Sequence, residues 1–127
     1  MHGGRLALAL VAVTASGHHS LDATYDLKTE VRLEGKVVQF LLRNPHSFLV
    51  MEDRNMQRWS LEWDGANSLA KAGITRDTLK NGDGVVVTLH PARTALDHRG
   101  VLSALHRESD GLAWDPKAKR NKKPPTD

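Results

Sequence analysis

The side chains in this sequence whose types and spacing could do chemistry are histidines, and two of them are adjacent. His18 and His19 follow an apolar run, and His46 comes directly after Pro45 in a predicted turn. Imidazole nitrogens are ligands for copper, zinc, nickel and iron. Because the sequence contains no cysteine, a transition-metal site would have to combine imidazoles with carboxylates or a free amino terminus. The histidines therefore predict a site for copper or another divalent transition metal.

The first residues are typical of an export signal. Arg5 is followed by a short apolar run from Leu6 to Val13 and then by small residues. This run is too short to span a bilayer as a helix. We therefore expect residues 1–17 to be a signal peptide and the protein to be periplasmic or secreted. A buried N-terminal helix of a cytoplasmic protein is the alternative.

The cleavage point would decide how the adjacent histidines bind a metal. Cleavage after Gly17 leaves His18 first, and its free amine and ring nitrogen could chelate copper together with a third nitrogen from elsewhere. Cleavage after Ala15 leaves Ser16, Gly17 and His18, whose amine, two backbone amides and imidazole form a square-planar set that copper(II) and nickel(II) favour. A plain linker role for the two histidines stays open.

Two further candidate ligands are His46 and Glu62. His46 could bind the metal, or it could hydrogen-bond the backbone of its own turn. Glu62 shares a predicted strand face with Ser60 and Arg58, opposite the tryptophans. It could act as a fourth ligand or as an outer partner of one, or it could simply face solvent. The remaining histidines of the predicted mature chain are expected at the surface: His90, His98 and His106.

Five β-type segments and one short helix are predicted to position these residues. In the first segment, Glu30 to Leu42, the apolar positions change parity near Val38, which predicts a bend or bulge with Gly35 beside it. The other strands are predicted over residues 47–53, 58–63, 84–90 and 101–108, with a helix over 66–73 ended by Gly73 and a hairpin that places Gly100 at a positive φ. This order predicts a mainly β fold, a five-stranded OB-like Greek-key barrel with its short helix between strands three and four. A small β-sandwich is the alternative.

One domain is expected, over residues 18–110 of the 127 in the chain. From Gly111 the composition becomes polar, basic and proline-bearing, so residues 111–127 are predicted to be a disordered tail. The segment from Lys117 to the end holds five of the 18 Lys and Arg residues, against 15 Asp and Glu in the whole chain. The formal charge of +3 therefore belongs to the predicted tail and does not indicate a binding face.

An ordered set of short motifs resembles a family of small exported bacterial proteins catalogued only as a domain of unknown function. The set is His-His-Ser at 18–20, Asn-Pro-His at 44–46, Trp-Ser-Leu-Glu-Trp at 59–63, Gly-Ala-Asn-Ser-Leu at 65–69, Ala-Gly-Ile-Thr at 72–75 and Leu-Lys-Asn-Gly-Asp at 79–83. The chain departs from the family at Gly17, where Ala is usual, at Ala66, where Pro is usual, and at Ile74, where an aromatic is usual. The resemblance implies export and an OB-like barrel, and it implies no established activity.

These observations favour an exported metal-binding or accessory protein that is not itself a catalyst and has no membrane span. The sequence contains neither a Gly-rich phosphate loop nor a nucleophile elbow. A non-catalytic OB module that binds a ligand or an exported protein partner is the alternative, on a strand face that includes Phe48, Arg58 or Trp59. Nucleic-acid binding is disfavoured, because the strands do not interleave basic and aromatic residues.

Overall fold

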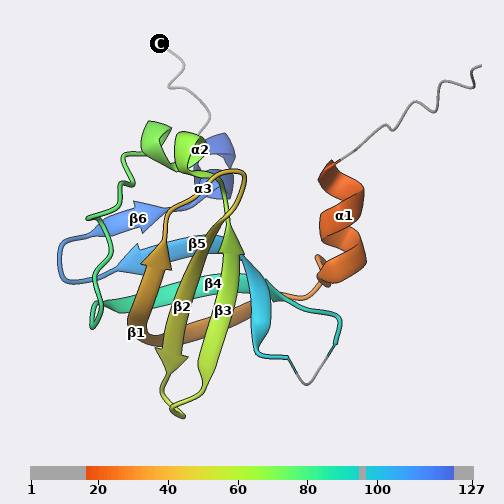
Figure 1. Cartoon of the computed structure of the whole chain (residues 1–127), viewed down its shortest axis with the longest axis horizontal. Coiled ribbons are helices and arrows are strands. Elements are labelled where there is room, and N and C mark those ends of the chain that lie inside the picture. Colours follow the sequence, from red (N-terminus) through yellow and green to blue (C-terminus); the bar gives the residue numbers. More distant parts are fainter. Residues whose placement is uncertain (1–16, 95–96, 122–127) are drawn as a thin grey trace, which may run out of the picture.

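The strands form a single sheet that closes on itself (Figure 1). The computed structural model describes residues 17–94 and 97–121. Across the sheet the strands follow the order β3-β2-β1-β4-β5-β6, and β3 also pairs in parallel with β5. The strands are β1 (Val31–Leu41), β2 (Ser47–Asp53), β3 (Arg58–Trp63), β4 (Gly84–Pro91), β5 (Arg99–Arg107) and β6 (Leu112–Trp114). The β3–β5 pairing closes the first five strands into a barrel, which confirms the predicted OB-like fold and argues against the sandwich.

Strand β1 is shared between the two halves of the barrel because it bends in the middle. Its first half, from Val31 to Lys36, pairs with β4, and the part from Gly35 onward pairs with β2. The β1–β2 register shifts between Val37 and Gln39. This bulge lies where the apolar positions change parity in the sequence, so the predicted change of buried face is confirmed.

Two glycines lie where neighbouring strands approach closely. A Cβ on Gly35 would overlap the carbonyl oxygen of Glu52 and lie 2.9 Å from its carbonyl carbon. Gly100 lies inside β5 and not at a positive φ, so the prediction of a turn glycine is wrong there. A Cβ on Gly100 would lie 2.6 Å from Leu89 Cδ1 and 2.8 Å from the His90 carbonyl oxygen. Both positions need glycine for space.

The interior of the barrel is apolar and draws on every strand of the closed part. On β3, Leu61 and Trp63 are almost fully buried and Trp59 packs partly against the same cluster, as the alternation of that strand predicts. Helix α2 (Ala66–Lys71) covers one end through Leu69, and Gly73 ends it at φ +79°. The core cluster comprises Val37, Leu49, Met51, Leu61, Trp63, Leu69, Ile74, Leu79, Val85, Val87, Leu89, Leu102 and Leu105.

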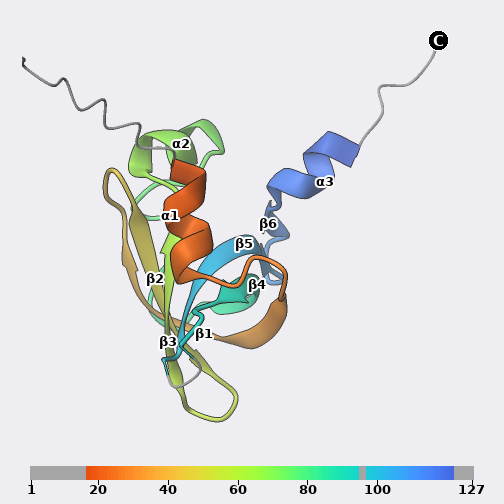
Figure 2. The ribbon, with the colours of Figure 1, turned by 90° about the vertical axis from the view of Figure 1, so that its right-hand side faces the viewer.

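Helix α1 (Gly17–Thr24) lies outside the barrel (Figure 1). Its N-terminal end is at the same end of the molecule as α2 and the β1–β2 loop (Figures 1 and 2). The chain after the helix is fixed to the barrel, because the backbone N–H of Asp26 donates to Pro91 at 2.9 Å and Tyr25 forms a β-bridge with Ala92. Arg93 also forms an ion pair with Asp22 of the helix at 2.9 Å.

The prediction of disorder from Gly111 is wrong for residues 111–121. Strand β6 pairs with β5, and helix α3 (Pro116–Asn121) follows it. The Trp114 ring packs edge-on against Trp63, with ring centroids 5.3 Å apart, and Leu112 also packs against the core cluster. These two apolar side chains bury surface against the core, and this burial is not indicated by the polar composition of the segment. Residues 122–127 of the predicted tail lie outside the described residues.

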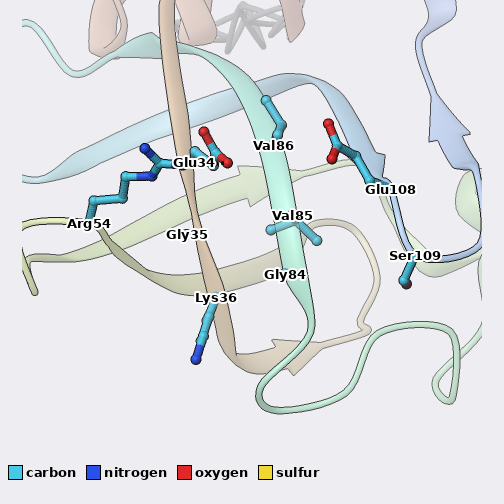
Figure 3. A pocket seen from close by; sticks show the side chains of 9 residues that line it. All are labelled: Glu34, Gly35, Lys36, Arg54, Gly84, Val85, Val86, Glu108 and Ser109. Carbon is cyan, nitrogen blue, oxygen red and sulfur yellow. Dashed lines mark ion pairs between the residues drawn. The ribbon is translucent and has the colours of Figure 1, made fainter.

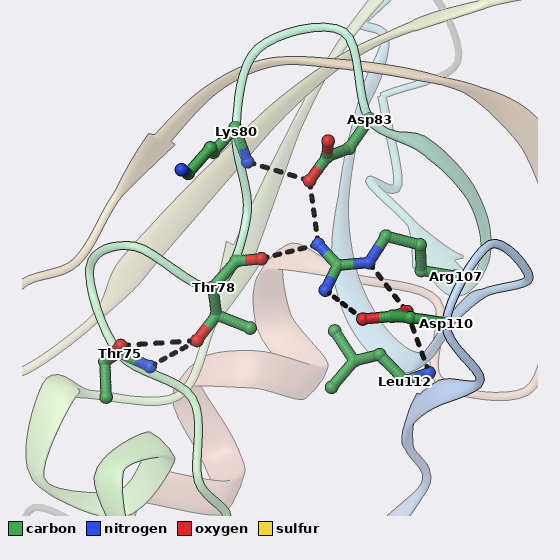
Figure 4. Close-up of polar contacts among 7 residues, drawn as sticks. All are labelled: Thr75, Thr78, Lys80, Asp83, Arg107, Asp110 and Leu112. Atoms are coloured by element: carbon green, nitrogen blue, oxygen red, sulfur yellow. Dashed lines mark hydrogen bonds and ion pairs between the residues drawn. The ribbon is translucent and has the colours of Figure 1, made fainter.

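Arg107 fixes the turn before β6 to the loop before β4 (Figure 4). Its guanidinium donates to Asp83 at 2.8 Å and to both carboxylate oxygens of Asp110, at 2.9 and 2.7 Å. It also donates to the carbonyl oxygen of Thr78 at 2.5 Å, and Asp110 accepts from the backbone N–H of Leu112 at 3.2 Å. The bidentate bond from Arg107 lowers the pKa of Asp110 to about 2.

Candidate metal-binding site

Two of the predicted ligands, His46 and Glu62, lie next to each other. The Nδ1 atom of His46 is 3.5 Å from Oε1 of Glu62. Their proximity follows from the antiparallel pairing of β2 with β3, which sets Ser47 opposite Trp63 and Phe48 opposite Glu62. The side chain of His46 is 54% exposed and that of Glu62 is 18% exposed, so the imidazole is open to solvent while the carboxylate is largely covered.

The loop that carries His46 is held by hydrogen bonds on both sides. The fully buried Ser47 hydroxyl donates to the carbonyl oxygen of Arg43 and accepts from its N–H, both at 3.1 Å. The side-chain oxygen of Asn44 accepts from the backbone N–H of Asn67 in α2 at 3.2 Å. The β1–β2 loop is therefore tied to itself and to α2, which limits the positions that the His46 backbone can take.

Tyr25 makes the third contact of this cluster. Its hydroxyl donates to Oε2 of Glu62 at 2.6 Å, and the tyrosine is only 6% exposed. Burial and the bond to the Glu62 carboxylate raise the pKa of Tyr25, with the Arg99 charge acting in the opposite direction. The phenol therefore stays protonated and acts as a donor. No role for Tyr25 is predicted from the sequence, where its one signal is its position shortly after the histidine pair.

The two other predicted ligands, His18 and His19, belong to the first turn of α1. Their side chains lie outside the part of the chain that the structure describes. Within residues 17–94 and 97–121, no group of three or more His, Cys, Asp or Glu residues is arranged to hold a metal ion. The described part of the predicted site is therefore the His46–Glu62 pair, with Tyr25 behind the carboxylate.

A comparison with models of protein families shows which family the chain belongs to. The model of a family of unknown function, DUF6152, matches residues 7–101. The chain belongs to this family. The DUF6152 match includes Tyr25, His46 and Glu62, and it ends within β5, so Arg107 and β6 lie beyond it. No curated protein matches the chain.

The other histidines of this DUF6152 chain have separate surroundings. Nδ1 of His90 donates to the carbonyl oxygen of Thr29 at 2.8 Å. The exposed ring of His98 lies edge-on to Trp59, with centroids 5.0 Å apart, and His106 is exposed on β5. These contacts of His90 and His98 are with Thr29 and Trp59, and they involve neither His46 nor Glu62.

A surface cavity of about 400 Å³ lies between β1, β4 and two turns (Figure 3). Val85 forms part of its wall, Arg54 and Glu34 form an ion pair at 2.8 Å on one side, and Glu108 lies on the other. Of the predicted metal ligands whose side chains the structure describes, neither His46 nor Glu62 lines it. Among the described residues, no helix has the length and apolar character that crossing a bilayer requires.

Proposed function

We propose that this DUF6152 protein is exported and binds copper or a similar divalent transition metal, as a metal-binding or accessory protein. His46 supplies a nitrogen from the barrel, and His18 and His19 supply nitrogens from the N-terminal segment. Glu62 acts beside His46 as an outer partner or as a fourth ligand. The export part rests on Arg5 and the apolar run after it in the sequence.

The contact between His46 and Glu62 is the observation that supports the metal site most. Metal-binding histidines commonly direct their second ring nitrogen to a carboxylate, which fixes the ring and increases its basicity. Here Oε1 of Glu62 is 3.5 Å from Nδ1 of a half-exposed imidazole, while its other oxygen is occupied by Tyr25. The N-terminal end of α1, which carries His18 and His19, lies at the same end of the molecule as the β1–β2 loop (Figures 1 and 2).

Calorimetric titration of the processed protein with copper(II), nickel(II) and zinc tests the proposal, together with the intact mass of the sample. We expect the triple variant His18→Ala/His19→Ala/His46→Ala to lose tight binding. His106→Ala is the matched control, because His106 is exposed on β5 and lies outside the cluster. If the triple variant binds all three metals as tightly as the wild type, the metal proposal is wrong.

The single variant His46→Ala separates two forms of the site. If the processed chain begins at His18, the amine and ring nitrogen of His18 need a third nitrogen, so loss of His46 should weaken copper binding greatly. If it begins at Ser16, the terminal segment supplies all four nitrogens, so loss of His46 should have little effect and His18→Ala should abolish tight binding. A failure of every metal would favour the alternative proposal, a non-catalytic OB module that binds a ligand or an exported protein.

A further inference from the structure

We infer that Tyr25 is a positioning residue that acts on His46 through Glu62, so that the imidazole carries its proton on Nδ1 and presents Nε2 as its donor nitrogen. The metal-binding role of Nε2 rests on the proposed function. The placement of the proton does not, because it follows from contacts within the protein alone.

The first step is the fixed position of the Tyr25 hydroxyl. The backbone N–H of Tyr25 donates to the carbonyl oxygen of Leu21 at 2.8 Å, and the residue bridges Ala92. The adjacent Asp26 donates to Pro91 at 2.9 Å. Backbone bonds on both sides therefore set where the buried phenol points, and it points at Glu62.

The second step is the orientation of the carboxylate. Glu62 lies in β3 between Leu61 and Trp63, both buried in the core, so its backbone is fixed. The Tyr25 hydroxyl occupies Oε2 at 2.6 Å, a short distance typical of an O–H donor to an ionised carboxylate. With one oxygen held, rotation about the terminal torsion of Glu62 is restricted. The other oxygen, Oε1, therefore stays toward His46.

The third step is the proton on the imidazole. An ionised carboxylate has only acceptor atoms. At 3.5 Å, Oε1 attracts an Nδ1–H group and repels an Nδ1 lone pair, so the neutral ring is stabilised with its proton on Nδ1. The lone pair then lies on Nε2, on the other side of a ring that is 54% exposed. A neutral Nε2 with an open approach is a suitable metal ligand.

The test is ¹⁵N NMR of the full chain without metal, at a mildly alkaline pH where imidazoles are neutral. His46 signals are assigned by their absence in His46→Ala. We expect wild-type His46 to be mainly the Nδ1–H tautomer and Tyr25→Phe to shift it toward Nε2–H, the form that free imidazole prefers. His90 is an internal control, because the carbonyl oxygen of Thr29 holds its Nδ1 proton independently of Tyr25.

A wild-type His46 that is mainly Nε2–H would overturn the inference, and so would an unchanged tautomer in Tyr25→Phe with His90 unaltered. Glu62→Gln provides a second route to the same answer if Tyr25→Phe does not fold. It removes the ionised acceptor, and a His46 that keeps the wild-type tautomer in this variant also overturns the inference.

A zinc titration followed by the same NMR signals separates this inference from the proposed function. If zinc binds, we expect coordination at Nε2 and an affinity about 10–100-fold lower in Tyr25→Phe, the usual effect of losing an outer partner of a metal ligand. Coordination at Nδ1 would overturn the inference. If zinc, copper and nickel all fail to bind, the proposed function is wrong, while the tautomer measurement still decides the role of Tyr25.

Discussion

Gly35 tests whether the bend of β1 is a requirement of the barrel. It pairs with Asp53 of β2 on one side and with Val85 of β4 on the other, so it lies where β1 passes from one half of the barrel to the other. We expect Gly35→Ala to destabilise the protein. The added Cβ would overlap the Glu52 carbonyl oxygen and lie 3.0 Å from Asp53 Cα, and both are backbone atoms of the paired strand.

The size of the effect follows from what must move. A flexible side chain could rotate away, but backbone atoms can only separate if the β1–β2 ladder opens locally. Overpacking of this kind costs typically about 1–3 kcal/mol. Losing one or two ladder hydrogen bonds, at about 0.5–1.5 kcal/mol each, gives a similar figure. For a domain of this size, each kcal/mol lowers the thermal midpoint by roughly 4–8 °C.

Gly84→Ala is the matched control. Gly84 is the β4 residue that pairs with Lys36, the neighbour of Gly35, and nothing lies within 4 Å of a Cβ built there. This substitution should be neutral or stabilise by up to about 1 kcal/mol, because alanine restricts the unfolded chain more than glycine does. Urea unfolding followed by circular dichroism measures both variants. An unchanged free energy of unfolding for Gly35→Ala, or an equal loss at Gly84, would refute the argument from close approach.

Two further predictions concern the C-terminal elements. Trp114→Ala should lower the free energy of unfolding by about 1–3 kcal/mol, less than for a fully buried tryptophan, because the half-buried ring packs against Trp63 and the core. The control Lys117→Ala removes an exposed ion pair with Glu30 and should change it by less than about 0.5 kcal/mol in the same urea titration; equal effects would mean that β6 does not dock. Because the pKa of Asp110 is lowered from 3.8 to about 2 in the folded state, its bond to Arg107 contributes stability above about pH 4, and this contribution is lost as the pH falls toward 2. Thermal midpoints measured across this range should fall less in Asp110→Asn than in the wild type, and parallel curves would contradict the assignment.

The elements that the sequence predicts well are those whose signal is local and repeated. The alternation of β3 places Leu61 and Trp63 inside, and the change of parity near Val38 locates the bulge of β1. The end of α2 is marked by Gly73, whose positive φ is a local requirement. These features confirm that the order of strands and the barrel follow from pattern and turn chemistry.

The features that sequence reasoning missed depend on contacts between distant positions. Strand β6 is only three residues long, so it has no periodicity to detect, and Trp63, the ring against which its Trp114 packs, lies far earlier in the chain. Tyr25 is the single tyrosine of the chain and meets Glu62 37 positions later. Gly100 lies in a segment whose composition is typical of a turn. The close approach of β4 explains why this residue is glycine.

The candidate site and the core depend on one feature, the register of β3 against its neighbours. Successive side chains of a strand point to opposite faces, so Glu62 faces outward because Leu61 and Trp63 face inward. A shift of one residue would bury the Glu62 carboxylate and expose the largest ring of the core. The apolar residues that stabilise the barrel therefore also keep Glu62 within reach of Tyr25 and His46. For this reason a carboxylate that contributes little to the core can hold a defined position beside an imidazole that is open to solvent.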